Sequence, residues 1–143
     1  MVSNFFLRIV SKQEGNSTKE IEEITIHNNK VSYINISNFP NNVSIKRTFF
    51  ISNQLVDQII SLIYELEIYK SKTFELYQIN QDCFQILELC VGKVHIVNKY
   101  SKISNNHAFL SLKDPEIFRN TNEFSNNIRY FLRRLLKINY QYD

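Results

Sequence analysis

Apolar and polar residues alternate along the first half of the chain with the period of two that is typical of β-strands. Four such segments follow one another, over residues 4–10, 19–27, 30–36 and 42–51. In the first segment Phe5, Leu7 and Ile9 share one face, which predicts a strand with one wholly apolar side. The connections are short, and the pair Asn28–Asn29 tolerates the positive φ of a hairpin turn. The pattern therefore predicts an antiparallel meander.

The spacing of apolar residues changes to three and four in two later segments, and both predict long helices. The first helix is expected over residues 53–67, with Ser52 or Asn53 as its N-cap. Its apolar surface is wider than one stripe, and such a helix usually contacts more than its own sheet. The second helix is expected over residues 114–139, where the only proline, Pro115, falls in the first turn.

Residues 83–100 lie between the two predicted helices and have the pattern of a β-hairpin, with Gly92–Lys93 at its tip. Glycine at the first position of a two-residue loop fits a type II′ turn. The order of four strands, helix, two strands and helix predicts an α+β fold. We expect a six-stranded antiparallel sheet with two long helices packed on one face, in one domain over residues 1–143.

The composition supports a folded protein and excludes several classes. Of the 143 residues 43% are hydrophobic, and eleven Phe and eight Tyr argue against disorder. The net charge of +3 is too small to indicate a nucleic-acid-binding protein by itself. No segment approaches the ~20 apolar residues of a membrane-spanning helix, and the N-terminal segment lacks the basic region of a signal peptide. We therefore expect no membrane contact.

The two cysteines, Cys83 and Cys90, are seven residues apart in one predicted strand. An odd separation places them on opposite faces of the strand, about 23 Å apart at a rise of about 3.3 Å per residue. Such a distance excludes a disulfide between them. A chain without a disulfide framework fits a reducing compartment.

Residues suited to catalysis or metal binding do not converge in the sequence. The three histidines, His27, His95 and His107, fall in different predicted segments without metal-ligand spacing. Glu22 and Glu23 are neighbours in one strand and therefore point to opposite faces. With only two glycines in the chain, a phosphate-binding loop is not expected. We expect neither enzymatic activity nor a cofactor or metal site.

Four basic residues gather in the last turns of the second predicted helix: Arg129, Arg133, Arg134 and Lys137. Arg129, Arg133 and Lys137 recur every four residues and form one edge beside the apolar stripe. Two interpretations stay open. In one, the charges complement the negative end of the helix dipole and face solvent. In the other, they form the basic rim of an interface with an acidic or phosphate-bearing partner, or bind RNA directly.

Five short motifs carry a resemblance that extends over nearly the whole chain. They are SNFFLR (3–8), VSYINISNFPNNV (31–43), ILELCVGKVHI (86–96), YSKI (100–103) and LKDPEIFR (112–119). In order and spacing they are similar to the motifs of the Mago nashi family, whose S-K-D-P-E-G-L-R also precedes a long helix. The register holds from residue 3 to about residue 136, with one residue lost near Asn28.

The chain departs from the family pattern at several loops. The family's Trp-Pro-Pro-Pro segment is replaced by LYQIN (76–80), and the chain has no Trp. Pro40 stands where a basic residue is expected, and the family's C-terminal ending is absent. The resemblance therefore supports the main family interface more than the accessory contacts that these loops make.

The resemblance implies an interaction protein, a core subunit of the exon junction complex, located in the nucleus with shuttling to the cytoplasm left open. The helices of Mago-like proteins cover the sheet of a tsunagi-type RRM protein, the face on which an RRM normally binds RNA. The resulting heterodimer helps lock a DEAD-box helicase on spliced mRNA. Contact between this chain and mRNA would then be indirect.

The resemblance places the RRM interface on the apolar stripes of the two helices, and Leu135 falls at a family interface position. The expected contact residues are Ile59, Ile63, Ile128, Phe131, Leu132, Leu135 and Leu136. For each of them, burial in the protein's own core is an equally open alternative. Direct RNA binding by the basic edge of the second helix remains the alternative function.

The start of the second helix is a second candidate contact. Asp114 before Pro115 makes a good N-cap, and Glu116 complements the helix dipole. Capping does not require Lys113 or Arg119. The resemblance places this corner on the helicase side of the complex, so Lys113, Glu116 and Arg119 form a candidate helicase-facing corner.

Overall fold

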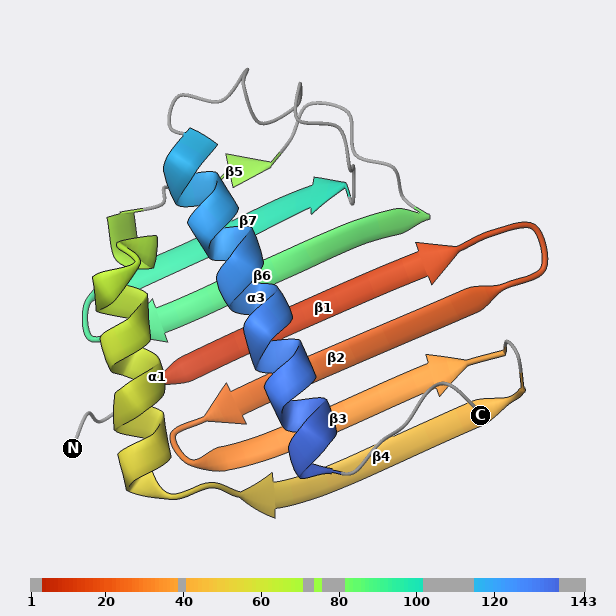
Figure 1. Cartoon of the computed structure of the whole chain (residues 1–143), viewed down its shortest axis with the longest axis horizontal. Helices are drawn as coiled ribbons and strands as arrows, with labels where there is room; N and C mark the ends of the chain where they lie inside the picture. Colours follow the sequence, from red (N-terminus) through yellow and green to blue (C-terminus); the bar gives the residue numbers. More distant parts are fainter. Residues whose placement is uncertain (1–3, 39–40, 71–73, 76–81, 102–114, 137–143) are drawn as a thin grey trace.

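One sheet forms the body of the molecule in the computed structural model, which describes residues 4–38, 41–70, 74–75, 82–101 and 115–136 (Figure 1). Its strand order is β4-β3-β2-β1-β6-β7-β5. The long strands are β1 Phe6–Glu14, β2 Lys19–His27, β3 Lys30–Ser37, β4 Val43–Phe50, β6 Cys83–Val91 and β7 Val94–Ser101. These six strands pair antiparallel with one another, which confirms the predicted sheet. The sequence pattern misses β5, Phe74–Glu75, which pairs parallel with β7, because two residues are too few to show alternation.

The two tight hairpins turn where the sequence predicts. Asn28 adopts a φ of 57° and Gly92 a φ of 58°, the left-handed region that these turns need. The Asn28 side chain also accepts a hydrogen bond from the backbone N–H of Phe5 at 3.2 Å. Lys93 has no positive φ, as expected in a type II′ turn.

Helix α1, Asn53–Glu65, connects β4 to the second half of the sheet. Of the two candidate N-caps the structure selects Ser52, whose Oγ accepts a hydrogen bond from the N–H of Leu55 at 3.1 Å. The helix ends earlier than predicted because Glu67 takes a φ of 58°, after which the short 3₁₀ helix η1, Ile68–Lys70, follows. The pattern does not predict η1, since a single turn has no periodicity of its own.

Helix α3, Pro115–Leu135, is the longest element and lies within the predicted range. The predicted N-cap Asp114 and the predicted last residue Asn139 lie outside the described residues. Within the described part of the chain, neither helix is both long and apolar enough to cross a membrane.

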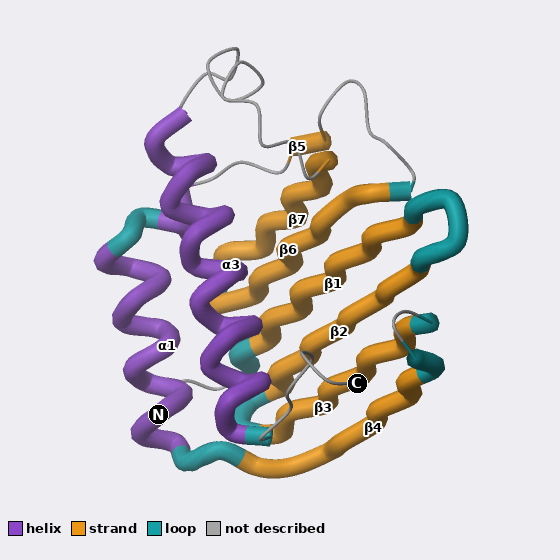
Figure 2. Tube along the Cα trace, turned by 45° about the vertical axis from the view of Figure 1, so that its right-hand side comes forward, coloured by secondary structure: helices purple, strands orange, loops and turns teal. Residues whose placement is uncertain are grey.

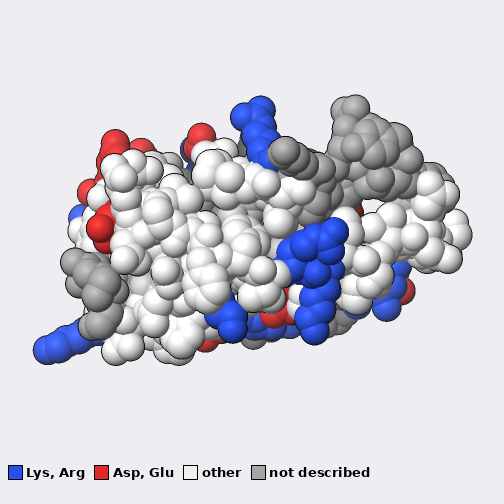
Figure 3. Space-filling view, turned by 90° about the horizontal axis from the view of Figure 1, so that it is seen from below, with Lys and Arg blue, Asp and Glu red and all other residues white. Residues whose placement is uncertain are grey.

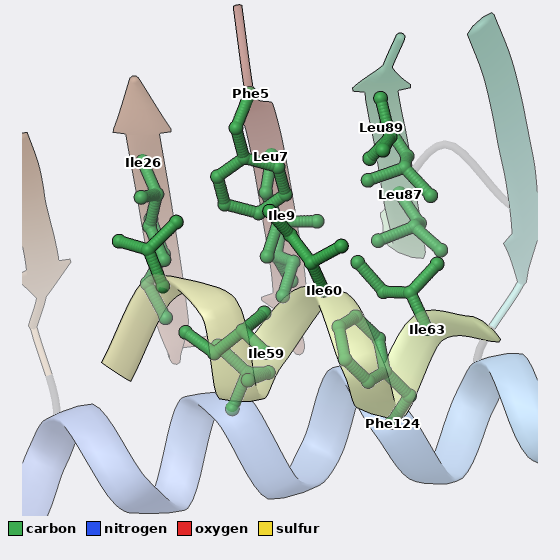
Figure 4. Packing of buried hydrophobic residues seen from close by; sticks show 14 of the residues in the cluster. Phe5, Leu7, Ile9, Ile26, Ile59, Ile60, Ile63, Leu87, Leu89 and Phe124 are labelled. Atoms are coloured by element: carbon green, nitrogen blue, oxygen red, sulfur yellow. The ribbon is translucent and has the colours of Figure 1, made fainter. Parts of the chain in front are cut away.

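Both helices lie on the same face of the sheet, and no described element covers the opposite, open face (Figure 2). The core fills the space between the two layers (Figure 4). Phe5, Leu7 and Ile9 point from the first strand region toward Ile63 of α1 and Phe124 of α3, and all five are almost completely buried. The predicted apolar face of this strand region is confirmed.

The helix-covered face of the sheet changes from apolar to polar along its strands. One row of register partners across the sheet is wholly apolar: Val31, Ile26, Leu7, Leu89 and Ile96. Four residues further along each strand lies a second row, also buried, which we name the polar row: Asn35, Glu22, Ser11, Gln85 and Tyr100. Buried polar side chains need hydrogen-bonding partners, so the polar row constrains what α3 can place over it.

Candidate protein-interaction site

The residue types that support catalysis stay apart in the described structure. No group of three His, Cys, Asp or Glu side chains within the described ranges is placed to hold a metal ion. His95 is exposed, with its Nε2 3.0 Å from the Glu88 carboxylate, and His107 lies outside the described residues. Glu22 is buried under α3, whereas Glu23 forms an ion pair with Arg8 at 2.9 Å on the open face. The predicted separation of these two carboxylates is confirmed.

The cysteines are free thiols at opposite ends of β6, and both are half-buried. Burial and the nearby Glu88 carboxylate raise the pKa of the Cys90 thiol. A raised pKa keeps the thiol protonated at neutral pH, and the protonated form is a poor nucleophile. The predicted absence of a disulfide between Cys83 and Cys90 is confirmed.

Four of the residues expected to contact the RRM partner belong to the protein's own core. Ile59 and Ile63 from α1, and Ile128 and Leu132 from α3, are each at most 6% exposed. They occupy the helix positions that point at the sheet, and the sheet covers them in the isolated chain. Of the two alternatives that the sequence leaves open for these four residues, burial in the isolated chain favours the core, and their contact with a partner stays a prediction.

The other three expected contact residues lie near the end of α3. Phe131 is 38% exposed and Leu135 is 47% exposed. Leu136 is half-buried and packs against the edge of the core. Large apolar side chains exposed this close together on one helix are candidates for contact with a partner.

Phe131 and Leu135 lie on the flank of α3 that is turned toward α1. Asn120, three helical turns before Phe131, donates a hydrogen bond to the backbone carbonyl of Leu66 at the end of α1, at 3.4 Å. In Figure 1 the two helices are close at this point and separate toward the end of α3. On α1 the half-buried Leu55 and Leu62 pack against the core. We name Leu55, Leu62, Phe131 and Leu135 the interhelical apolar surface.

Two exposed aromatic residues of the helix layer are missing from the sequence-based expectation. Tyr64 of α1 and Tyr130 of α3 are both exposed. The guanidinium of Arg133 lies 5.9 Å from the centre of the Tyr130 ring, a cation–π distance. Helical spacing alone places both tyrosines away from the buried stripe, so the sequence pattern was sufficient to predict their exposure.

The two described residues of the predicted basic rim, Arg129 and Arg133, turn inward toward the sheet. Nε of Arg129 and Nε of Arg133 each donate to the carboxylate of Glu22 at 2.6 Å, one to each oxygen. The Tyr33 hydroxyl donates to the same carboxylate at 2.5 Å. Glu22 is 1% exposed, and the two arginine side chains are 12% and 18% exposed. Sequence spacing missed this cluster because Glu22 and Arg129 are 107 residues apart.

The cluster decides the charge state of Glu22. Burial alone would raise the pKa of this carboxyl, because a low-dielectric site disfavours the charged form. The positive charges of Arg129 and Arg133, with hydrogen bonds from Arg133 and Tyr33, outweigh burial and hold the pKa below its ordinary value. Glu22 is therefore ionised at neutral pH and balances one of the two guanidiniums.

The remaining predicted residues lie at the two ends of α3. Arg134 is exposed, and Lys137 lies outside the described residues. In the view from below, Lys and Arg side chains form one larger group and several separate ones, and uncharged residues make up most of the surface between them (Figure 3). Glu116 and Arg119 are exposed at the start of α3, whereas Lys113 of the same candidate corner lies outside the described residues.

The sequence profile of the Mago nashi protein family matches residues 5–143, almost the whole chain. The match agrees with the sheet and the two-helix layer described above. Members of this family are non-catalytic interaction subunits associated with the exon junction complex and mRNA processing. The fold, the motifs and the extent of the match together identify this chain as a member of the Mago nashi family.

Proposed function

We propose that this chain forms a heterodimer with a tsunagi-type RRM protein, using its helix layer to cover the RNA-binding sheet of the partner. The sheet of an RRM carries aromatic side chains that stack on RNA bases, and an apolar helix surface can bury the same side chains. The heterodimer then helps hold a DEAD-box helicase on spliced mRNA, in the nucleus and during export. The chain itself acts without catalysis.

One observation carries the proposal: Phe131 and Leu135 of the interhelical apolar surface are exposed on α3, whereas Phe124, Ile128 and Leu132 of the same helix are buried. Interfaces between proteins typically place apolar and aromatic residues at their centre. Tyr130 adds exposed aromatic area beside Phe131, and Arg134 adds a charge next to Leu135. The partner contact is therefore proposed at the end of α3 and the adjoining flank of α1.

The contact with the helicase is proposed at the other end of α3. Glu116 and Arg119 are exposed there, and Lys113 is the third residue of this corner in the sequence. Charged side chains at the edge of an interface contribute more to association rate and specificity than to affinity. The corner would then select the helicase, while the apolar surface holds the RRM protein.

The alternative function, direct binding of RNA by the basic edge, is less favoured by the contacts of the two arginines. Arg129 and Arg133 already donate to Glu22, so phosphate groups would compete with a buried carboxylate. A salt titration separates the two functions, because phosphate contacts weaken steeply with rising salt. Binding of an RRM protein through an apolar surface should change little over the same range.

The substitution Leu135→Arg tests the heterodimer directly. A charge at the centre of an apolar interface should weaken binding by about 30-fold or more, equivalent to ~2 kcal/mol. The matched control is Ile36→Arg, because Ile36 is 51% exposed but projects from the open face of the sheet. Calorimetric titration with the tsunagi-type RRM protein of the same organism measures both. Wild-type affinity in the Leu135→Arg variant would remove this surface from the interface.

A further inference from the structure

A polar flank of α3 forms hydrogen bonds with the polar row of the sheet at two strands, β7 and β2. Near the start of the helix, Asn122 accepts a hydrogen bond from the hydroxyl of Tyr100 in β7 at 2.9 Å. Two to three turns later, Arg129 and Arg133 donate to Glu22 in β2. Positions 122, 129 and 133 share one flank of an α-helix. This flank therefore forms a seam over the sheet that is hydrogen-bonded to β7 near the start of α3 and to β2 near its end.

The seam constrains α3 in a way that its apolar stripe does not. Contacts among Phe124, Ile128 and Leu132 are non-directional, and a helix can rotate or slide over an apolar surface at small cost. Hydrogen bonds from two guanidiniums to two oxygens of one carboxylate require one rotation and one axial position. The end of α3 is held in place by Glu22 in particular.

That rotation decides which side chains reach the surface. At 3.6 residues per turn, Phe131 follows Arg129 by about 200° and Leu135 follows Arg133 by the same angle. Drawing the two arginines down to Glu22 therefore turns Phe131 and Leu135 to the opposite flank, which faces α1. The same rotation of α3 therefore exposes Phe131 and Leu135 and buries Arg129 and Arg133.

We propose that Glu22 is a positioning residue for the partner surface: it fixes the rotation of the last turns of α3 and so presents Phe131 and Leu135. The proposal rests on the proposed function for the identity of the partner. Beyond that function, partner binding would depend on the Glu22 carboxylate, which is buried in β2 and does not itself contact the partner. Without Glu22 the two guanidiniums lose their buried partner and turn toward solvent. The end of α3 then adopts other rotations about the helix axis.

Three variants separate positioning from simple loss of stability. Glu22→Leu leaves two guanidiniums without their carboxylate, and Glu22→Gln keeps a hydrogen-bonding side chain of the same length. The triple variant Glu22→Leu, Arg129→Leu, Arg133→Leu removes the whole charge cluster. Replacing all members of a buried ion cluster with apolar residues is often neutral or stabilising, whereas removing one member is destabilising.

Partner affinity is measured at a temperature where each variant is folded. We expect Glu22→Leu to bind the RRM protein at least about tenfold more weakly, and Glu22→Gln to lose less. The triple variant should regain stability but keep the weaker binding, because an apolar seam does not fix rotation. Wild-type affinity in the triple variant would overturn the proposal, since Glu22 would then act through stability alone.

Amide hydrogen exchange in the isolated chain gives a readout that needs no partner. Residues 129–135 should exchange faster in the Glu22→Leu and triple variants than in the wild type, while α1 exchanges as before. Unchanged exchange at the end of α3 would contradict positioning even if the heterodimer forms. If the wild-type chain binds no RRM protein, the heterodimer fails, and the exchange experiment still decides the role of Glu22.

Discussion

A buried carboxylate that accepts hydrogen bonds from two guanidiniums and a phenol makes the stability of this protein sensitive to acid. The folded-state pKa of Glu22 is lowered by Arg129 and Arg133, with Tyr33 contributing. A lowered pKa means that the stabilisation is fully present above the unfolded-state value of about 4.3. It is lost as the pH falls through the lower, folded-state pKa.

We therefore expect the free energy of unfolding of the wild type to fall more steeply in acid than that of Glu22→Gln. The variant should be less stable at neutral pH, and the difference should narrow toward pH ~3. Urea unfolding at a series of pH values measures both curves. A difference that stays constant with pH would show that Glu22 does not titrate with a lowered pKa.

The sequence predicts the burial and contacts of some residues but not of others. The buried positions of Phe5, Leu7 and Ile9 follow from alternation, which needs only near neighbours in the chain. The pairing of Glu22 with Arg129 and Arg133 depends on the placement of α3 across the sheet, which no local pattern contains. For the same reason, helical spacing predicts an apolar stripe but not which of its members a partner reaches.

At the scale of elements, the start of α1 depends on one cap. Ser52 adopts an extended backbone conformation and its Oγ accepts the Leu55 N–H. The substitution Ser52→Ala leaves that N–H without a partner in the helix and should cost about 1 kcal/mol. Asn53→Ala is the matched control, because Asn53 is exposed in the first turn and should change stability by less than ~0.5 kcal/mol. Urea unfolding with equal m-values would test both; equal losses would reject Ser52 as the cap.

Long elements could be predicted from the sequence to within a few residues, and short ones could not. The six long strands and both helices carry several periods each. β5 and η1 contain two and three residues and depend on contacts with β7 and with the end of α1. Only a local event, the positive φ at Glu67, determines where α1 ends.

At the scale of the whole molecule, sheet and helices share one hydrophobic core. Leu89 is completely buried between the layers, so Leu89→Ala should lower the free energy of unfolding by about 2–5 kcal/mol. Ile34→Ala, on the half-buried open face, should cost less. Circular dichroism and tyrosine fluorescence should report the same transition, because a shared core unfolds cooperatively. Separate transitions for the two probes would indicate independent units.

The Glu22 cluster also restricts how this sequence can change over generations. Replacing Arg129 or Arg133 alone removes one of the two positive charges that stabilise the buried Glu22 carboxylate. Replacing Glu22 alone leaves two largely buried guanidiniums without a negative charge. Substitutions at positions 22, 129 and 133 are therefore expected to be strongly non-additive, although position 22 is more than a hundred residues from the other two. We therefore expect that a homologue lacking one of these three charged residues also lacks the other two.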